Sequence, residues 1–174
     1  MTHQLNFIYN DSDWIAPAEY PDLSKATEIA IDLETKDPNI KTKGPGWATF
    51  DGHIVGFAVA ALGQQWYFPI AHDAGGNMDL SITCAWMQDV LKTDATKIFH
   101  NASYDVGWLL VNGFQIKGKI VDTMIAAALI NENRFSFSLN ACAKDYLGEI
   151  KNETFLNEKA KEWGIDPKAD MWKL

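Results

Sequence analysis

Apolar residues in the first half of the chain gather in short, β-rich runs that are bounded by glycine and proline. Residues 27–33 predict a buried strand. The runs 53–62 and 64–70 are joined around Gly63 and predict an antiparallel hairpin. Between these strands, the Gly/Pro-punctuated segment 39–52 predicts a loop long enough to have a functional role. The first half of the chain is therefore expected to consist mainly of strands and loops.

In the second half, apolar residues recur at the spacing of helices, with short strands between them. The predicted helices lie at about residues 80–92, at 102–113 and at 123–130, and the predicted strands at 96–101 and 117–122. Two further helices are expected to end at Gly148 and Gly164. Strands followed by alternating helices and strands favour an α/β fold, in which helices cover a mixed sheet.

The 174 residues fit one domain with a sizeable core. Residues 1–26 mix polar and aromatic positions, and we expect an irregular lead-in with one short strand near Phe7. The domain proper is expected to cover residues 27–174. Cys84 and Cys142 form no CxxC motif and are expected to be reduced core residues. No export signal or membrane-spanning apolar run is present in the sequence, which predicts a cytoplasmic protein without a membrane partner.

The formal net charge of −8 at pH 7, with Arg134 as the only arginine, restricts the ways in which this chain could bind nucleic acid. Proteins that hold nucleic acid mainly through phosphate contacts are usually basic. A role on nucleic acid therefore requires a cation between the protein's carboxylates and the phosphates, or affinity borrowed from a neighbouring domain.

Asp32 and Glu34 are the first candidates for holding such a cation. Residues i and i+2 of a strand point to the same face, so these two side chains project together. Two like charges raise each other's pKa unless a cation neutralises them, and Mg²⁺ prefers carboxylate oxygens. Two solvated acids at the end of a strand, without a metal, would give the same sequence motif. This motif alone therefore does not distinguish a metal site from a structural pair.

A second segment, FHNASYDVGWLL, adds a third acid. Asn101 lies at the expected helix entrance, where asparagine is a favoured N-cap, and Tyr104 and Asp105 lie in the first turn. An acid in the first turn of a helix ordinarily complements the helix dipole. If this helix begins beside the strand of Asp32, however, Asp105 would reach the same point, and three acids without a basic partner in either motif indicate a metal site.

The remaining polar candidates are expected to be structural. Asp122 precedes the apolar helix 123–130 and is predicted to be its N-cap, acting as an orienting residue rather than a ligand. The four histidines, which we expect to be non-catalytic, are His3, His53, His72 and His100.

The segments AIDLET, HNASYD and DTM, in this order, resemble the motifs of the DEDD family of 3′–5′ exonucleases. With WYFPIAHD, they resemble most the proofreading domain of family A DNA polymerases of bacteriophage type. The resemblance covers nearly the whole chain and implies an RNase H-like fold with a five-stranded mixed sheet. It also implies hydrolysis of phosphodiester bonds at the 3′ end of single-stranded DNA, which releases nucleotide monophosphates, in the cytoplasm of a host cell.

The same resemblance implies two divalent ions, Mg²⁺ or Mn²⁺, and assigns roles to individual residues. Asp32 would bridge both ions, Glu34 would bind one, and Asp105 would hold the second, partly through water. Asn101 and Tyr104 match residues that contact the terminal nucleotide in the family. A loose match also puts Pro38 and Ile40 where a wedge parts the terminal base.

The chain departs from the family at the third motif, usually Tyr-x-x-x-Asp, which does not occur in residues 139–174. In phage-type relatives this motif follows a segment like MWKL, and a polymerase domain lies further on. We therefore expect a C-terminally incomplete exonuclease domain that folds, binds metal weakly and cleaves poorly. Two alternatives stay open: a nucleic-acid-binding module of the same fold without turnover, and an exonuclease that trims RNA 3′ ends.

Overall fold

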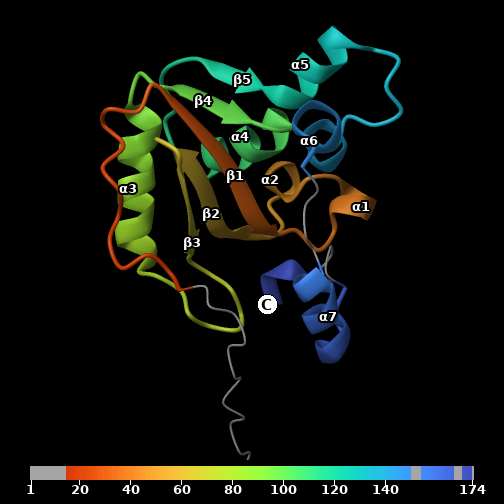
Figure 1. Ribbon diagram of the computed structural model, residues 1–174. Helices are drawn as coiled ribbons and strands as arrows, with labels where there is room; N and C mark the ends of the chain where they lie inside the picture. Colours follow the sequence, from red (N-terminus) through yellow and green to blue (C-terminus); the bar gives the residue numbers. More distant parts are fainter. Residues whose placement is uncertain (1–14, 150–153, 167–169, 174) are drawn as a thin grey trace, which may run out of the picture.

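The computed structural model describes residues 15–149, 154–166 and 170–173, and a five-stranded sheet forms its centre (Figure 1). The strands are β1 (Glu28–Lys36), β2 (His53–Ala61), β3 (Gln64–Pro69), β4 (Thr96–Phe99) and β5 (Ile120–Asp122). They lie in the order β3-β2-β1-β4-β5. The β1–β2 and β2–β3 pairs are antiparallel, and the β1–β4 and β4–β5 pairs are parallel. The predicted mixed sheet and the hairpin around Gly63 are both confirmed.

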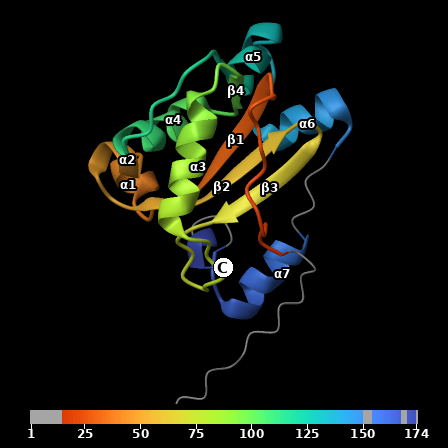
Figure 2. The same cartoon turned by 90° about the vertical axis from the view of Figure 1, so that its left-hand side faces the viewer.

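Helices lie on both sides of this sheet, as Figure 2 shows. α3 (Leu80–Lys92) and α4 (Ala102–Val111) cover one face, whereas α6 (Leu139–Leu147) lies on the opposite side. α5 (Thr123–Ile130) follows β5, and α7 (Thr154–Trp163) and the short 3₁₀ helix η1 (Met171–Lys173) lie near the carboxyl end of β1 (Figure 1). The helices predicted around residues 80–92, 102–113 and 123–130 are present, and Gly148 and Gly164 end α6 and α7 as predicted.

The core lies between the sheet and the pair α3 and α4. Ile29, Ile31 and Leu33, which alternate along β1, are buried on this face together with Met87 of α3 and Leu109 of α4. Burial of large apolar side chains of this kind is the main favourable term in folding. By the same alternation, Asp32 and Glu34 point to the opposite face of β1.

Four predicted elements were wrong in extent or content. β1 continues to Lys36 instead of ending at Leu33, so Asp32 and Glu34 lie inside the strand. The segment 39–52 is not a plain loop, because it holds two one-turn helices, α1 (Ile40–Lys43) and α2 (Gly46–Thr49). β4 and β5 are also shorter than the strands predicted at 96–101 and 117–122. Tertiary contacts, rather than local propensity, decide such boundaries.

Several smaller predictions can also be compared with the structure. Residues 15–26 form no helix or strand, although Leu23 packs into the core. Cys84 and Cys142 are free thiols; Cys142 is buried and Cys84 half-buried. Within the described part of the chain, none of the helices has the length and apolar character that crossing a bilayer requires. The expected strand near Phe7, and His3, lie outside the described residues.

Candidate active site

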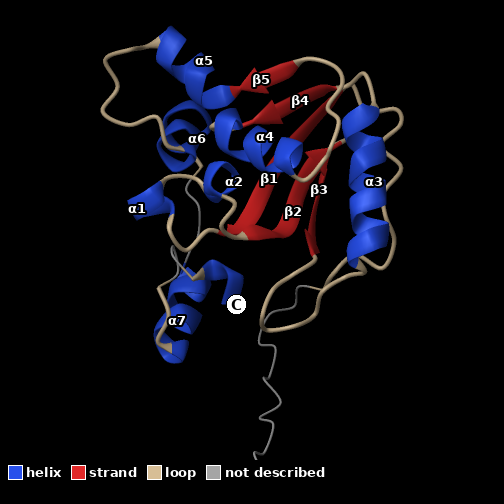
Figure 3. Cartoon of the chain, turned by 180° about the vertical axis from the view of Figure 1, so that it is seen from behind, coloured by secondary structure: helices blue, strands red, loops and turns tan. Residues whose placement is uncertain are grey.

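The site forms where β1 and β4 separate. These parallel strands are paired from Glu28 to Ala30 of β1, opposite Thr96 to Ile98 of β4, and no further. On its other side, β1 stays paired with β2 through Lys36. Beyond Ala30, one edge of β1 is therefore open, and α4, which follows β4 after only two residues, begins beside it (Figure 3).

Asp105 of α4 fills this opening. Its Oδ1 accepts a hydrogen bond of 3.0 Å from the backbone N–H of Leu33, and only 3% of the residue is exposed. Leu33 lies between Asp32 and Glu34, so α4 lies beside the strand of Asp32, which was the condition that the sequence left open. Asp105 therefore reaches the stretch of β1 that carries the other two acids.

Burial and like charge control the protonation of Asp105. Its pKa is raised to about 7, chiefly by desolvation and also by the negative charges of Asp32 and Glu34, while the hydrogen bond from Leu33 acts in the opposite direction. A carboxylate that its surroundings push toward the neutral form gains most from a nearby cation, because a cation favours the ionised form.

The donor chemistry of this site fits a hard divalent cation, because all three side chains offer carboxylate oxygens. Among residues 15–149, 154–166 and 170–173, no three aspartate, glutamate, histidine or cysteine side chains converge into a ready-made metal cage. A cation bound at this point would be held by Asp32, Glu34 and Asp105.

Asn101 and Tyr104 flank this site, but Asn101 does not act as predicted. It occupies the N-cap position of α4 in a left-handed conformation (φ 70°), and its side chain makes no capping hydrogen bond. Its Oδ1 accepts instead from the hydroxyl of Ser103 at 3.2 Å. Asn101 therefore holds the predicted N-cap position without capping α4 through its side chain.

Asp122 supplies the cap that Asn101 does not. Its carboxylate accepts from the N–H groups of Asn101 (3.1 Å) and Ala102 (2.8 Å) at the start of α4, and from Met124 (2.8 Å) and Ile125 (3.4 Å) at the start of α5. Burial acts to raise the pKa of Asp122, yet these four N–H groups lower it overall. The predicted N-cap of the helix 123–130 is confirmed, and the same residue also anchors α4.

The sequence analysis missed Thr35 and Asp37, which follow the acids on β1. The hydroxyl of Tyr104 donates to Asp37 Oδ2 at 2.9 Å and also lies 2.8 Å from Thr35 Oγ1. Burial raises the pKa of Tyr104, which keeps its hydroxyl protonated. The signal was their place one and three residues after Glu34, at and just beyond the end of β1, but only the fold shows that α4 reaches them.

Tyr67 of β3 approaches the same carboxylates from across the sheet. Its ring passes over Gly56, where an added Cβ would collide with it, and Gly56 pairs with Glu34 in the β1–β2 ladder. Burial raises the pKa of Tyr67, as do the charges of Glu34 and Asp32. His72 Nε2 shares a hydrogen bond with the Tyr67 hydroxyl. His72, expected to be non-catalytic, therefore lies in contact with a residue at the site.

Two further histidines, His53 and His100, lie within the described residues. His100 joins β4 to α5 and to the segment before α6, through hydrogen bonds of 2.8 Å to Thr123 Oγ1 and 2.8 Å to the Phe137 carbonyl. His53 is exposed at the start of β2. Pro38 and Ile40, the loosely matched wedge residues, are both exposed next to the carboxyl end of β1.

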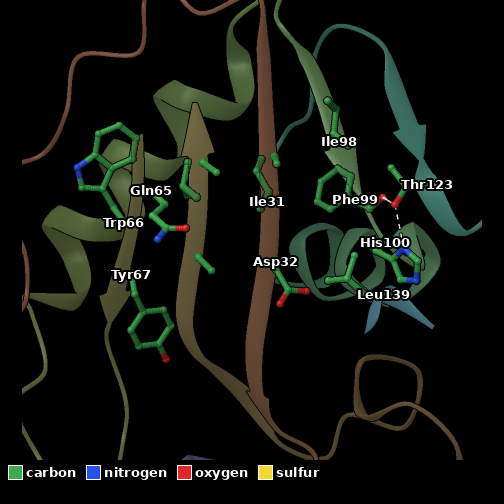
Figure 4. A pocket seen from close by; sticks show the side chains of 14 residues that line it. Ile31, Asp32, Gln65, Trp66, Tyr67, Ile98, Phe99, His100, Thr123 and Leu139 are labelled. Carbon is green, nitrogen blue, oxygen red and sulfur yellow. Dashed lines mark hydrogen bonds between the residues drawn. The ribbon is translucent and has the colours of Figure 1, made fainter. Parts of the chain in front are cut away.

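A hollow of about 650 Å³ opens on the sheet face beside Asp32 (Figure 4). Its walls come from four neighbouring strands and include Ile31, Tyr67, Phe99 and His100, with Leu139 of α6 at one side. Asp32 and Tyr67 both line this hollow, from β1 and β3 (Figure 4). A ligand held at the carboxylates therefore has open space on one side.

Comparisons with known proteins agree with this fold. Escherichia coli RNase D, whose structure is described as that of an exoribonuclease involved in structured RNA processing, superposes with a TM-score of 0.54 at 15% identity, over 87% of this chain and 36% of RNase D. Brucella melitensis NrnC with bound Mg²⁺ superposes with a TM-score of 0.54 at 16% identity, over 86% of this chain and 81% of NrnC. The fold is that of the RNase H-like DEDD exonucleases.

Sequence similarity shows to which family within this fold the chain belongs. The family model of DNA polymerase A exonucleases, described as 3′-5′ exonuclease, matches residues 18–174, and the chain belongs to this family. It is similar to a DNA-directed DNA polymerase of Pseudomonas phage M6, with 35% identity over 97% of this chain and 26% of that polymerase. The chain thus spans about a quarter of the length of the curated relatives that it matches.

Proposed function

We propose that this chain is an exonuclease domain that removes nucleotide monophosphates from the 3′ end of single-stranded DNA, in the proofreading role of a DNA polymerase. One observation carries the proposal: Asp105 of α4 binds the backbone of Leu33, between Asp32 and Glu34. Two segments 70 or so residues apart therefore deliver carboxylates to one point. The similarity to the phage M6 polymerase supports DNA as the substrate and a polymerase domain as the partner.

Asp32, Glu34 and Asp105 would hold two divalent ions, Mg²⁺ or Mn²⁺. Bound at these carboxylates, such ions supply Lewis-acid stabilisation of charge on the scissile phosphate and lower the pKa of a bound water. The roles of the chain's own groups are positioning and orientation: Asn101 and Tyr104 contact the terminal nucleotide, and Asp122 holds the first turn of α4 in place. Tyr67 limits the space next to Glu34.

The test uses a 5′-labelled single-stranded DNA oligonucleotide with Mg²⁺ or Mn²⁺, beside an Asp32→Ala variant. We expect the wild-type chain to shorten the oligonucleotide from its 3′ end, and the variant to lose this activity by at least about a hundredfold. Calorimetric titration with Mn²⁺ should show that the variant also loses metal binding, because Asp32 would be one of the carboxylates that hold the ions.

Other outcomes identify the alternatives. Binding of the oligonucleotide without shortening would indicate a binding module of the same fold. Faster shortening of an RNA oligonucleotide of the same sequence would indicate a 3′-end-trimming ribonuclease. Unchanged Mn²⁺ affinity in Asp32→Ala would contradict the assignment of the metal site.

A further inference from the structure

Asp37 is a buried carboxylate at the end of β1 that the proposed chemistry does not use. Only 9% of the residue is exposed. Its Oδ2 accepts from the Tyr104 hydroxyl at 2.9 Å and from the backbone N–H of Gly46 at 2.9 Å. Its Oδ1 is buried and has no hydrogen-bond partner among the described residues. Asp37 therefore joins three elements, β1, α2 and α4, at one carboxylate.

The hydroxyl of Tyr104 is fully engaged inside the protein. It has one proton, which it donates to Asp37, so the Thr35 hydroxyl at 2.8 Å must be the donor in the second hydrogen bond. The resulting chain runs from Thr35 through Tyr104 to Asp37 and ends on a charge, which makes its last bond one of the stronger kind. What remains of Tyr104 for a ligand is its half-buried ring, one residue before Asp105.

The segment around α2 is clamped onto the same helix. A Cβ at Gly46 would lie 2.9 Å from the ring of Trp108, and a Cβ at Gly107 would lie 2.5 Å from the ring of Trp47. α2 and α4 therefore pack with backbone against indole at both points, and they lie side by side in Figures 1 and 3. The hydrogen bond from the backbone N–H of Gly46 to Asp37 also joins α2 to the end of β1.

Stability alone gives little reason for a carboxylate here. A buried oxygen without a partner costs free energy, on the order of 1–3 kcal/mol. Such costs are commonly found where a side chain has a functional position to hold.

We propose that Asp37 is a positioning residue for the substrate: it holds the Tyr104 ring as a fixed wall beside the carboxylates, against which the terminal nucleotide of a single-stranded 3′ end lies. This inference rests on the proposed exonuclease function. Since Asp37 acts through Tyr104, its loss should weaken substrate binding while the metal-binding carboxylates stay in place.

The test compares Asp37→Leu, Tyr104→Phe and the double variant. Leucine is close to aspartate in shape but cannot accept from the Tyr104 hydroxyl, and Tyr104→Phe leaves the hydrogen bond between Gly46 and Asp37 intact. We expect each single variant to raise KM for the single-stranded oligonucleotide by about tenfold, with kcat within about twofold and Mn²⁺ affinity near wild type. The double variant should lose no more than either single variant, because both changes remove the same interaction.

Asp79→Ala is the matched control. Asp79 is also a carboxylate that accepts from a backbone N–H, that of Ile82 at 2.8 Å, but it caps α3, away from the site. This variant should leave KM unchanged. Thermal unfolding of every variant establishes that it is folded at the assay temperature.

Three results would overturn the inference. An unchanged KM in Tyr104→Phe would mean that Asp37 only anchors α2. Losses that multiply in the double variant would mean that the two residues act independently. If the wild-type chain neither bound nor shortened the oligonucleotide, the exonuclease proposal would fail, and this inference with it; the first two results would overturn the inference alone.

Discussion

At the scale of the residue, Asp105 combines two opposing requirements. Its carboxylate is buried to complete the hydrogen bonding of Leu33, and it faces two further negative charges. Burial of an ionised group is unfavourable unless a charge of opposite sign compensates it. In the absence of a cation, the ionised form of Asp105 therefore opposes folding.

The variant Asp105→Asn measures this cost, because asparagine retains an oxygen for the N–H of Leu33. The pKa in the folded chain is raised from 3.8 to about 7, so ionisation removes stability as the pH rises through this window. In EDTA at pH 8 we expect the variant to be more stable than wild type by about 2 kcal/mol, and the difference to shrink at pH 5. Urea unfolding at both pH values measures the free energies.

The opposite order at pH 8, with wild type the more stable protein, would show that the charge of Asp105 is already compensated in the folded chain. Addition of Mn²⁺ should reverse the ranking, since the cation favours the carboxylate over the amide.

At the scale of the element, one side chain sets the relative position of two helices. Asp122 accepts from N–H groups at the start of α4 and of α5. The first N–H groups of a helix have no partner within the helix, so a shared cap ties both helix starts to β5. The direction of α4, and with it the place of Asp105, depends in part on this carboxylate.

Asp122→Ala should therefore cost more than the loss of a single cap. We expect a decrease in the free energy of unfolding of about 2–3 kcal/mol, against about 1 kcal/mol for Asp79→Ala, which uncaps α3 alone. Urea unfolding at neutral pH in EDTA gives both values. Equal losses in the two variants would mean that the bonds from Asn101 and Ala102 contribute nothing to stability.

At the scale of the whole molecule, the net charge of −8 opposes the approach of DNA. The long-range field of the protein affects how fast and how tightly a charged ligand binds. Here the described site contributes three carboxylates, so attraction has to come from cations held at the site rather than from a basic surface.

Binding of single-stranded DNA should consequently depend on divalent ions. We expect the dissociation constant of a fluorescein-labelled oligonucleotide to rise by at least about tenfold when Ca²⁺ is replaced by EDTA at constant ionic strength. Fluorescence anisotropy measures this directly. Equally tight binding in EDTA would instead point to a binding surface that does not involve the carboxylates.

Many features of this fold could be predicted from the sequence, because they depend on local patterns of apolar and polar residues. Alternation along β1 placed Asp32 and Glu34 on one face, and helical periodicity located α3, α4 and α5. The capping role of Asp122 followed from its position before an apolar helix. These features depend on residues that are near one another in the chain, so spacing alone determines them.

Only the tertiary structure decided which distant residues meet. The separation of β1 from β4 after Ala30 admits Asp105 to Leu33, and the packing of α2 on α4 brings Asp37 to Tyr104. Neither contact follows from local spacing alone, because each depends on how whole elements pack. At the start of α4, likewise, it is Asp122 at the end of β5, and not Asn101, that accepts from the N–H of Ala102.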